Sequence, residues 1–352
     1  MMQLKYNLNT EIYRGAMQIY TGLNTKKLAD IPALAKKAED LGFDGVGFGE
    51  VSVDAFLPAT LSASSTNRLL VGTSISLAFV RSPMATAYTS WGIQELSNGR
   101  FELGLGTQVK AHNERRFSVP WVAPAPRLRE LVNSIRAIWD CWQNGTTLNF
   151  QGEHYNFNLM PPEFNPGPLA CGIPKINIAA MNTNMVQLAG EVGDGFLPHG
   201  FNTSKYVNEI TLPELETGAK RAGRTLKDFT ISGGGFIASG LDDKEVARQF
   251  EVVRRRISFY GSTRAYRPVL EVHGWEKTGD QLREMSKNNQ WDEMPGLVTD
   301  EMVEAFAIVG KYKDLPDMLK KRYHYASRIN LEFPKTAEAE EEILAAMAAM
   351  KS

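Results

Sequence analysis

Cysteine is scarce in this chain of 352 residues, where Cys141 and Cys171 are the two that occur. They do not form the closely spaced CxxC pair that is typical of zinc sites and redox motifs. A large secreted protein is seldom stabilised by a single disulfide, so the cysteine content favours a reducing compartment. We therefore expect a cytoplasmic protein.

A surplus of positive charge is also missing, because 39 Lys and Arg residues are matched by 40 Asp and Glu residues. Without a positive field the chain has little to attract a nucleic-acid backbone. The longest nearly apolar stretch, Leu69 to Val80, is too short to span a bilayer, and Met1 to Thr10 lack the apolar segment of a secretory signal. We expect a soluble protein with neither a nucleic-acid nor a membrane partner.

Eight short β-like runs alternate with helical stretches, which is typical of βα units around a parallel sheet. A chain of this length suits one (β/α)8 TIM barrel, which needs about 250 residues plus insertions. We expect residues 1–352 to form one such domain, with Met1–Arg14 as an N-terminal extension. The expected strands are Met17–Thr21, Gly45–Gly49, Leu69–Ala78, Phe101–Gly106, Ile176–Ala180, Gly195–Pro198, Phe229–Ala238 and Arg328–Phe333.

Longer segments interrupt the alternation at residues 107–125, 144–174 and 258–297. The first and third follow the C-terminal end of a strand or its helix, where insertions usually build a pocket. The middle one has the pattern of a β-hairpin followed by a proline-rich loop. Residues 336–350, rich in Ala and Glu, predict a closing helix.

Two strand ends could carry chemistry. Gly104-Leu105-Gly106 follows a strand, but Val109 stands where a dinucleotide-binding GxGxxG motif needs its third glycine, so a Rossmann fold loses its support. At Ala179 to Asn184 a strand gives way to a helix, expected to begin at Met185, whose unpaired N–H groups and positive dipole end attract phosphate. Most such helix starts are simply capped, and both interpretations stay open.

Five stretches of the chain match motifs of one known family. They read AEDLGFDGVGFGE (residues 38–50), VGTSISLAFVRSPM (71–84), ELSNGRFELGLGTQVKAHNERRF (95–117), LAGEVGDGF (188–196) and FYGSTRAYRPVLEVHGW (259–275). With them the chain resembles the luciferase-like monooxygenase superfamily, in its deazaflavin (coenzyme F420)-dependent branch, over nearly its whole length. The last stretch is similar to a narrower subfamily, mostly oxidoreductases of unassigned substrate.

This resemblance implies a luciferase-like TIM barrel with the tricyclic cofactor ring over its mouth. It implies that the cofactor phosphate lies at the helix after strand five, which points to Met181, Asn182 and Thr183. It also implies a non-prolyl cis peptide against the ring face, in a bulge of strand three, where Ser74 and Ile75 stand.

The segment after strand four is similar to one that hydrogen-bonds the polar edge and ribityl chain of the cofactor. Thr107, Gln108 and Asn113 occupy the matching positions, and their amide and hydroxyl groups suit that work. The resemblance further implies a homodimer or a higher homo-oligomer.

The chain departs from the family where a catalytic histidine is expected. Many relatives carry an Asp-His pair after strand two, whereas residues 50–54 read EVSVD. His199 directly follows strand six and is our leading acid or base, although it could instead only line the pocket. Glu50 is the alternative acid unless it forms a rim ion pair, and His112 is a secondary candidate that could equally be a solvated loop residue.

Aromatic residues gather in the first and third insertions. Trp121, Tyr260, Tyr266 and Trp275 would form the apolar walls of a substrate pocket, or else pack the insertions onto the barrel. Both roles are common for such side chains.

We therefore expect an oxidoreductase that transfers a hydride between coenzyme F420 and a small organic substrate. An FMN-dependent monooxygenase of the same fold is the first alternative, and a barrel that binds flavin without catalysis is the second. A metal-dependent hydrolase would need clustered ligands, and the five histidines include no HxH pair, so we expect no metal.

Overall fold

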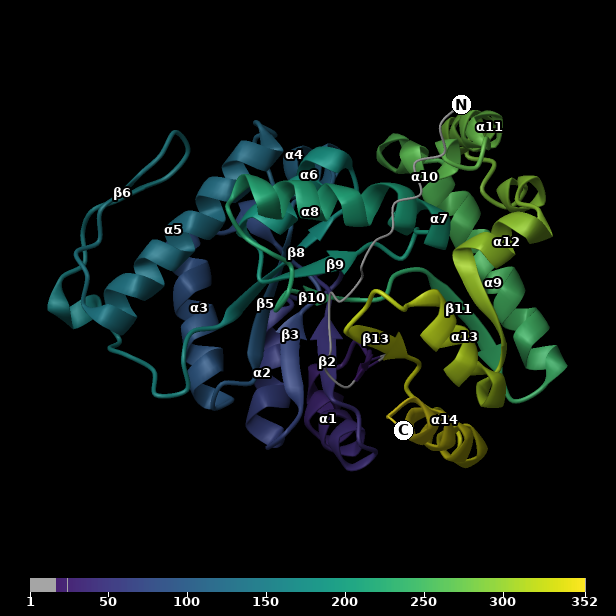
Figure 1. The fold of residues 1–352 in the computed structure, drawn as a ribbon, viewed down its shortest axis with the longest axis horizontal. Helices are drawn as coiled ribbons and strands as arrows, with labels where there is room; N and C mark the ends of the chain where they lie inside the picture. The colour runs from purple at the N-terminus through teal and green to yellow at the C-terminus, as the bar shows by residue number, and fades with distance from the viewer. Residues whose placement is uncertain (1–16, 24, 352) are drawn as a thin grey trace.

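Eight parallel strands surround a central axis in the computed structural model, which describes residues 17–23 and 25–351 (Figure 1). They are β1 (Gln18–Thr21), β2 (Gly45–Phe48), β3 (Leu70–Thr73), β5 (Phe101–Gly106), β8 (Lys175–Ala180), β9 (Gly195–Pro198), β10 (Thr230–Ile231) and β13 (Arg328–Leu331). Their order is β10-β9-β8-β5-β3-β2-β1-β13, and a parallel bridge from Ser232 to Arg328 joins the two ends. The expected (β/α)8 barrel is confirmed, while the extension Met1–Arg14 lies outside the described residues.

Helices cover the outside of the barrel because each returns the chain across the sheet and buries one apolar face. In α1 (Ile31–Asp40), for example, Ile31, Ala35 and Ala38 are buried at helical spacing. The other outer helices are α2 (Phe56–Ser65), α3 (Pro83–Leu96), α5 (Pro124–Asn144), α6 (Thr183–Val192), α8 (Leu212–Arg221), α13 (Leu315–Arg322) and α14 (Ala337–Lys351). The last of these matches the closing helix expected at 336–350.

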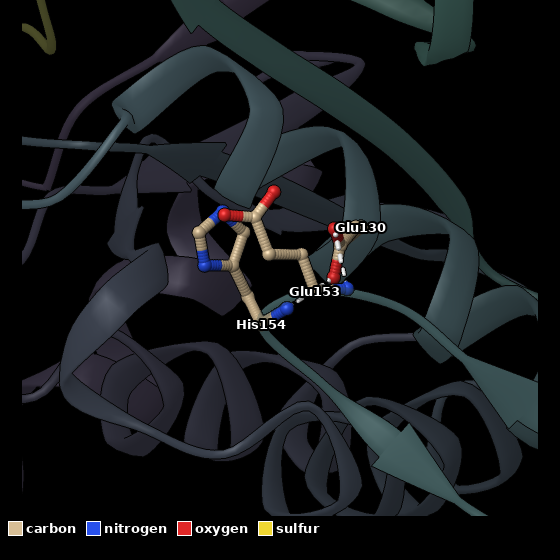
Figure 2. Close-up of side chains that lie close together, drawn as sticks. All are labelled: Glu130, Glu153 and His154. Atoms are coloured by element: carbon tan, nitrogen blue, oxygen red, sulfur yellow. Dashed lines mark hydrogen bonds between the residues drawn. The ribbon is translucent and has the colours of Figure 1, made fainter.

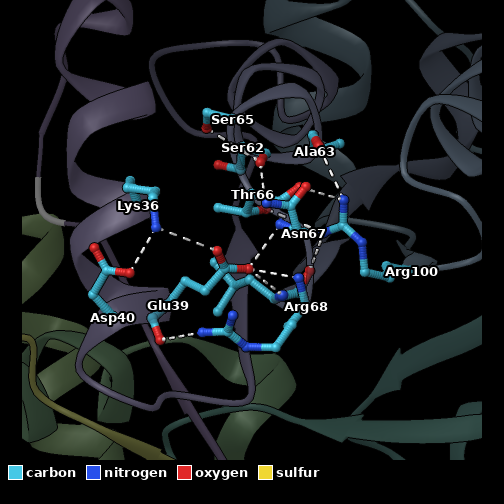
Figure 3. Close-up of polar contacts among 11 residues, drawn as sticks. Lys36, Glu39, Asp40, Ser62, Ala63, Ser65, Thr66, Asn67, Arg68 and Arg100 are labelled. Carbon is cyan, nitrogen blue, oxygen red and sulfur yellow. Dashed lines mark hydrogen bonds and ion pairs between the residues drawn. The ribbon is translucent and has the colours of Figure 1, made fainter.

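The segment between α2 and β3, at the N-terminal end of the barrel, is held by two charged side chains (Figure 3). The carboxylate of Glu39 accepts hydrogen bonds from the backbone N–H groups of residues 67–69, and Arg100 donates to the backbone oxygens of Ala63, Thr66 and Leu69. Glu39 is only 3% exposed, so its charge depends on these partners. This end of a TIM barrel usually serves stability.

The expected seventh strand, Phe229–Ala238, is wrong as a single element. The structure has β10 in the barrel and a separate β11 (Phe236–Gly240), which pairs with β12 (Ala307–Lys311), a strand that the sequence did not predict. Between β10 and β11 stand three consecutive glycines, and Gly235 has a φ of 110°, which no strand allows. The glycines therefore turn the chain out of the barrel.

The strands β11 and β12 begin and end a side lobe at one side of the barrel (Figure 1). Its helices are α9 (Asp243–Gly261), α10 (Arg267–Glu271), α11 (Glu276–Lys287) and α12 (Asp300–Phe306). Phe236, Val253, Ile257 and Phe306 form part of a second buried cluster there, together with Phe201 from the loop after β9. Most of the expected insertion 258–297 is therefore helical and belongs to this lobe.

The insertion at 144–174 projects from the other side of the barrel (Figure 1). It contains the expected hairpin, as the antiparallel pair β6 (Phe150–Gln151) and β7 (Asn156–Phe157). The carboxylate of Glu130 accepts hydrogen bonds from the backbone N–H groups of residues 153–155 and so caps the turn. Figure 2 shows the side chains of Glu130, Glu153 and His154, which lie close enough together to bind one metal ion. The Glu130 carboxylate, however, already accepts the hydrogen bonds of the turn.

The part of the chain that the structure describes contains no helix that is both long and apolar enough to cross a membrane.

Candidate active site at the barrel mouth

Strand three is interrupted at the C-terminal end of the barrel, which we call the mouth. Val71 pairs with Phe101 and Ser76 with Leu105, so four residues on strand three face three on β5. The extra residue makes a bulge, after which the short strand β4 (Ser76–Leu77) resumes the pairing. The peptide between Ser74 and Ile75 is cis, as the family resemblance implied.

Glycines on both neighbouring strands make room for this bulge. A Cβ atom on Gly47 would lie 3.0 Å from the Ser74 Cβ, and one on Gly106 would lie 2.8 Å from the Ile75 Cδ1. Side chains at these positions would therefore collide with the bulge. The sequence analysis did not identify them as site residues, although the alternating glycines of GVGFG (45–49) and GLG (104–106) were a visible signal.

Glu50 fastens the bulge to the end of β2. Its backbone N–H donates to the Ile75 oxygen at 3.0 Å, and its carboxylate accepts from the Leu77 N–H at 2.9 Å. The same carboxylate pairs with the Arg81 guanidinium at 2.7 Å, and its side chain is 8% exposed. The structure thus shows the rim ion pair that was the alternative to a catalytic acid at Glu50.

The loop after β5 contains the three residues that we expect to contact the cofactor, and their side chains differ in burial and in hydrogen bonding. Gln108 has a φ of 57°, and its side-chain oxygen accepts from the N–H of Val109. Asn113, in the short helix α4 (Lys110–Arg116), is buried, and its amide donates to the backbone oxygens of Thr107 and Val109. Asn113 therefore shapes the loop, while the half-buried Thr107 and Gln108 remain within reach of the mouth.

The start of α6 follows β8, the strand next to β5. The Asn182 side chain caps the helix by accepting from the Met185 N–H at 3.2 Å, so the helix begins at Thr183 and not at Met185 as expected. Asn182, Thr183 and Asn184 are exposed. The first amides of the helix point outward with the positive end of its dipole, which suits an anion.

His199 lies one residue beyond β9, between two tyrosines of the side lobe. Its ring centroid is 4.6 Å from that of Tyr266, stacked, and 4.8 Å from that of Tyr260, edge to face. We call these three side chains the ring cluster. Burial lowers the pKa of His199 to about 4, so the ring is neutral near pH 7.

The ring cluster and the start of α6 lie on the same side of the mouth. Met181 packs against the second buried cluster, as do Tyr260 and Tyr266, and the Met181 oxygen accepts from the Tyr206 hydroxyl at 2.9 Å. An anion at α6 and a substrate at His199 would therefore be neighbours.

The remaining expected site residues do not join this cluster. Trp121 packs against the barrel core, with its ring 6.3 Å from that of Phe79. Trp275 stacks on His273, with the ring centroids 4.2 Å apart, and packs against the second buried cluster. His112 is exposed on α4.

The interior of the barrel below the mouth is polar and nearly full. Arg328 pairs with Glu102 at 2.7 Å, and its guanidinium lies 4.1 Å from the ring centroid of Tyr20. The cavity above this pair, which Ser74 and Pro198 help to line, measures about 70 Å³. Ligand pockets are usually about 300 Å³ or larger, so a tricyclic ring would have to lie over the mouth.

A larger cavity, of about 920 Å³, opens at the opposite end of the barrel, where Gln18, Phe101 and Thr230 begin their strands. We do not place the active site there, because TIM-barrel enzymes carry their chemistry at the C-terminal ends of the strands.

Comparison with known proteins shows the family to which the chain belongs. Residues 8–327 match the model of the luciferase-like monooxygenase family. An uncharacterized protein of Mycobacterium tuberculosis is 44% identical over 296 residues, which cover 84% of this chain and 87% of that protein. The 5,10-methylenetetrahydromethanopterin reductase of Archaeoglobus fulgidus is 30% identical over 305 residues, 84% of this chain and 86% of the reductase.

Among solved structures, the coenzyme F420-dependent tetrahydromethanopterin reductase of Methanopyrus kandleri has the same fold. It matches with a TM-score of 0.77 at 21% identity, over 94% of this chain and 98% of that one. The family resemblance read from the motifs is thus confirmed, and membership sets aside the barrel without catalysis. The chain belongs to the luciferase-like monooxygenase family and is an oxidoreductase.

Proposed function

We propose that this oxidoreductase uses coenzyme F420 to transfer a hydride to or from a small organic substrate. The bulge at Ser74 and Ile75 carries the proposal, because it lies at the mouth between two glycine-bearing strands, and one of these, β5, pairs with β8, which leads into α6. The similarity to a putative coenzyme F420-dependent oxidoreductase of Mycobacterium tuberculosis, 28% identical over 297 residues, favours a deazaflavin over FMN.

The residues at the mouth fit such a cofactor. The amides at the start of α6, at Met181, Asn182 and Thr183, would hold its phosphate, and the Ser74-Ile75 bulge would support one face of its ring. The cofactor, when bound, supplies the carbon that gives or accepts the hydride. The protein orients the two reactants and keeps water from the reacting atoms.

Thr107 and Gln108 would hydrogen-bond the polar edge and the ribityl chain. Both side chains are half-buried beside the mouth, so neither is enclosed in the core. Asn113 would act on them indirectly, by holding the loop in shape.

An FMN-dependent monooxygenase is the second candidate, and the family match favours it because the family is named for monooxygenases. A helix start binds the phosphate of either cofactor. Expression in a host that makes both, followed by the absorption spectrum and mass of the copurified cofactor, separates the two. We expect F420, and FMN alone would overturn the proposal.

Two accompanying expectations concern the enzyme as a whole. The family resemblance favours a homodimer or larger homo-oligomer, which light scattering after gel filtration would measure. The low cysteine content favours the cytoplasm.

A further inference from the structure

We propose that His199, fixed between Tyr260 and Tyr266, is a neutral hydrogen-bond donor that binds an uncharged acceptor of the substrate, a carbonyl oxygen or the oxygen of the corresponding alcohol. This inference rests on the proposed function, because it assigns a substrate class to the same mouth. It also excludes a carboxylate or phosphate at that position. The ring geometry, the direction of the side chain and the charges around it support the proposal.

The hydrogen bond at Nδ1 fixes which nitrogen carries the proton. The backbone N–H of Phe201 donates to Nδ1 of His199 at 3.0 Å, so Nδ1 is an acceptor and the proton of the neutral ring is on Nε2. Within residues 17–23 and 25–351, Nε2 has no hydrogen-bond partner, and it is not one of the atoms that are buried without one. A ligand can therefore reach an N–H donor.

The direction of the side chain follows from the strand that precedes it. A Cβ on Gly195 would lie 2.3 Å from the Asn177 Oδ1, and Leu197 lines the cavity inside the barrel. Residues 195 and 197 lie on the face of β9 that is directed toward the barrel axis, and His199 follows this strand by one residue, at the mouth. The two tyrosines then cover the imidazole from the side lobe.

No cation accompanies the imidazole within the ring cluster. Among the residues that the structure describes, the titratable groups whose rings pack against His199 are the phenols of Tyr260, on α9, and Tyr266, before α10. Burial raises the pKa of Tyr266 to about 12, so its phenol is uncharged near pH 7. An anion buried beside uncharged rings would lose its hydration without a compensating charge, whereas a carbonyl or alcohol oxygen needs only the N–H.

Nitrogen-15 NMR of histidine-labelled protein tests the state of the ring directly. The His199→Asn variant assigns its signals among those of the five histidines. We expect one neutral form at pH 7, protonated on Nε2, that remains neutral at pH 6. A His199 that is cationic at pH 6, or protonated on Nδ1, would overturn the proposal.

A control variant tests the role of the ring contacts. Tyr266→Phe keeps the stacked ring, and Tyr266→Ala removes it, so only the second should move the titration of His199 toward an ordinary value. His273→Asn is the matched control, because His273 is also stacked on an aromatic ring but its Nε2 already pairs with the Thr203 hydroxyl.

Small probes then test the substrate class. Cyclohexanone and cyclohexanecarboxylate have similar shapes and differ in charge. We expect the ketone to shift the Nε2 signal of His199 saturably in wild type and in His273→Asn. A stronger response to the carboxylate, or no response to the ketone up to its solubility limit, would contradict the proposal.

The failure of this inference is distinguishable from failure of the proposed function. The NMR measurements need no cofactor, whereas F420 binding is followed separately by quenching of its fluorescence. F420 binding together with a charged His199 would leave the function standing and remove the inference. A neutral His199 that binds the ketone, in a protein that does not bind F420, would leave the inference standing and remove the proposed function.

Discussion

At the scale of single residues, the structure distinguishes a side chain placed to contact the substrate from side chains that hold the site in shape. His199 meets Tyr260 and Tyr266 across about 60 positions of sequence, and no local pattern could announce that contact. Its place after a strand could be predicted, but its low pKa could not, because burial comes from the side lobe. The sequence could place Glu50 at the rim of the barrel. Whether its carboxylate is an acid or forms an ion pair could not be predicted, because this depends on the position of Arg81.

Replacing His199 tests its part in the reaction. His199→Asn should lower kcat by about 10²-fold, the lower end of what one positioned hydrogen-bond donor to the reacting oxygen contributes. F420 affinity should stay within about twofold, because the cofactor contacts are elsewhere. Steady-state kinetics and fluorescence titration measure the two, with His112→Asn, on the exposed face of α4, as the control. Unchanged turnover across pH 6–9 would remove His199 from the mechanism.

Burial of His199 also makes stability depend on pH. Its pKa is lowered from 6.5 to about 4 in the folded protein, so the unfolded chain binds more protons between these values. This contribution to stability is complete above pH 6.5 and is lost as the pH falls toward 4, by on the order of 2 kcal/mol. Urea unfolding at pH 7, 6 and 5 should show a smaller acid loss in His199→Asn than in wild type. Equal losses would contradict the assigned pKa.

Replacing Glu50 should change the stability of the protein and not the proton transfer in its reaction. Glu50→Gln leaves the Arg81 guanidinium with one charged partner, Asp54, and weakens the fastening of the bulge. We expect a loss of about 2–3 kcal/mol in urea unfolding, less than the roughly 3–5 kcal/mol for a fully buried pair, because the Arg81 side chain is 20% exposed. The pH dependence of kcat should keep its shape. A folded variant of wild-type stability without turnover would instead make Glu50 the acid.

At the scale of elements, the sequence placed barrel strands one, two, four, five, six and eight to within about two residues, whereas the expected third strand, Leu69–Ala78, is divided by the bulge into β3 and β4. Apolar alternation is a local property, and so are the turns that bound these strands. The seventh strand failed because three glycines inside an otherwise β-like run redirect the chain, and β12 was missed because its partner β11 is about 70 residues away. The start of α6 was placed two residues late, since Asn182 is the cap.

A negative charge introduced at the start of α6 should weaken cofactor binding without lowering the stability of the protein. Thr183→Glu places a carboxylate where we expect the cofactor phosphate, so F420 affinity should fall tenfold or more, about 1.4 kcal/mol. The same charge at a helix N-terminus should leave thermal stability equal or slightly higher. Ser64→Glu, which adds a charge on the exposed face of α2, is the control. Equal affinities for all three proteins would place the phosphate elsewhere.

At the scale of the whole molecule, the barrel and the side lobe contribute different parts of one site. The barrel supplies the bulge, the loop after β5 and the start of α6, while the lobe places two tyrosines against His199. The matching stretches include the bulge and the loop after β5, and the stretch 259–275 includes both tyrosines, whereas the start of α6 lies outside them. The contact of the tyrosines with His199 could not be predicted, since it depends on how α9 and α10 pack beside the mouth.

A crystal structure of the protein with F420 tests the central claim most directly, that the mouth is a deazaflavin site. It should show the phosphate on the amides at the start of α6, at Met181, Asn182 and Thr183, with one face of the ring against Ser74 and Ile75. The ring should lie over the mouth, with His199 across the space left for substrate. A phosphate bound at another strand end, or a ring turned away from the bulge, would contradict the account.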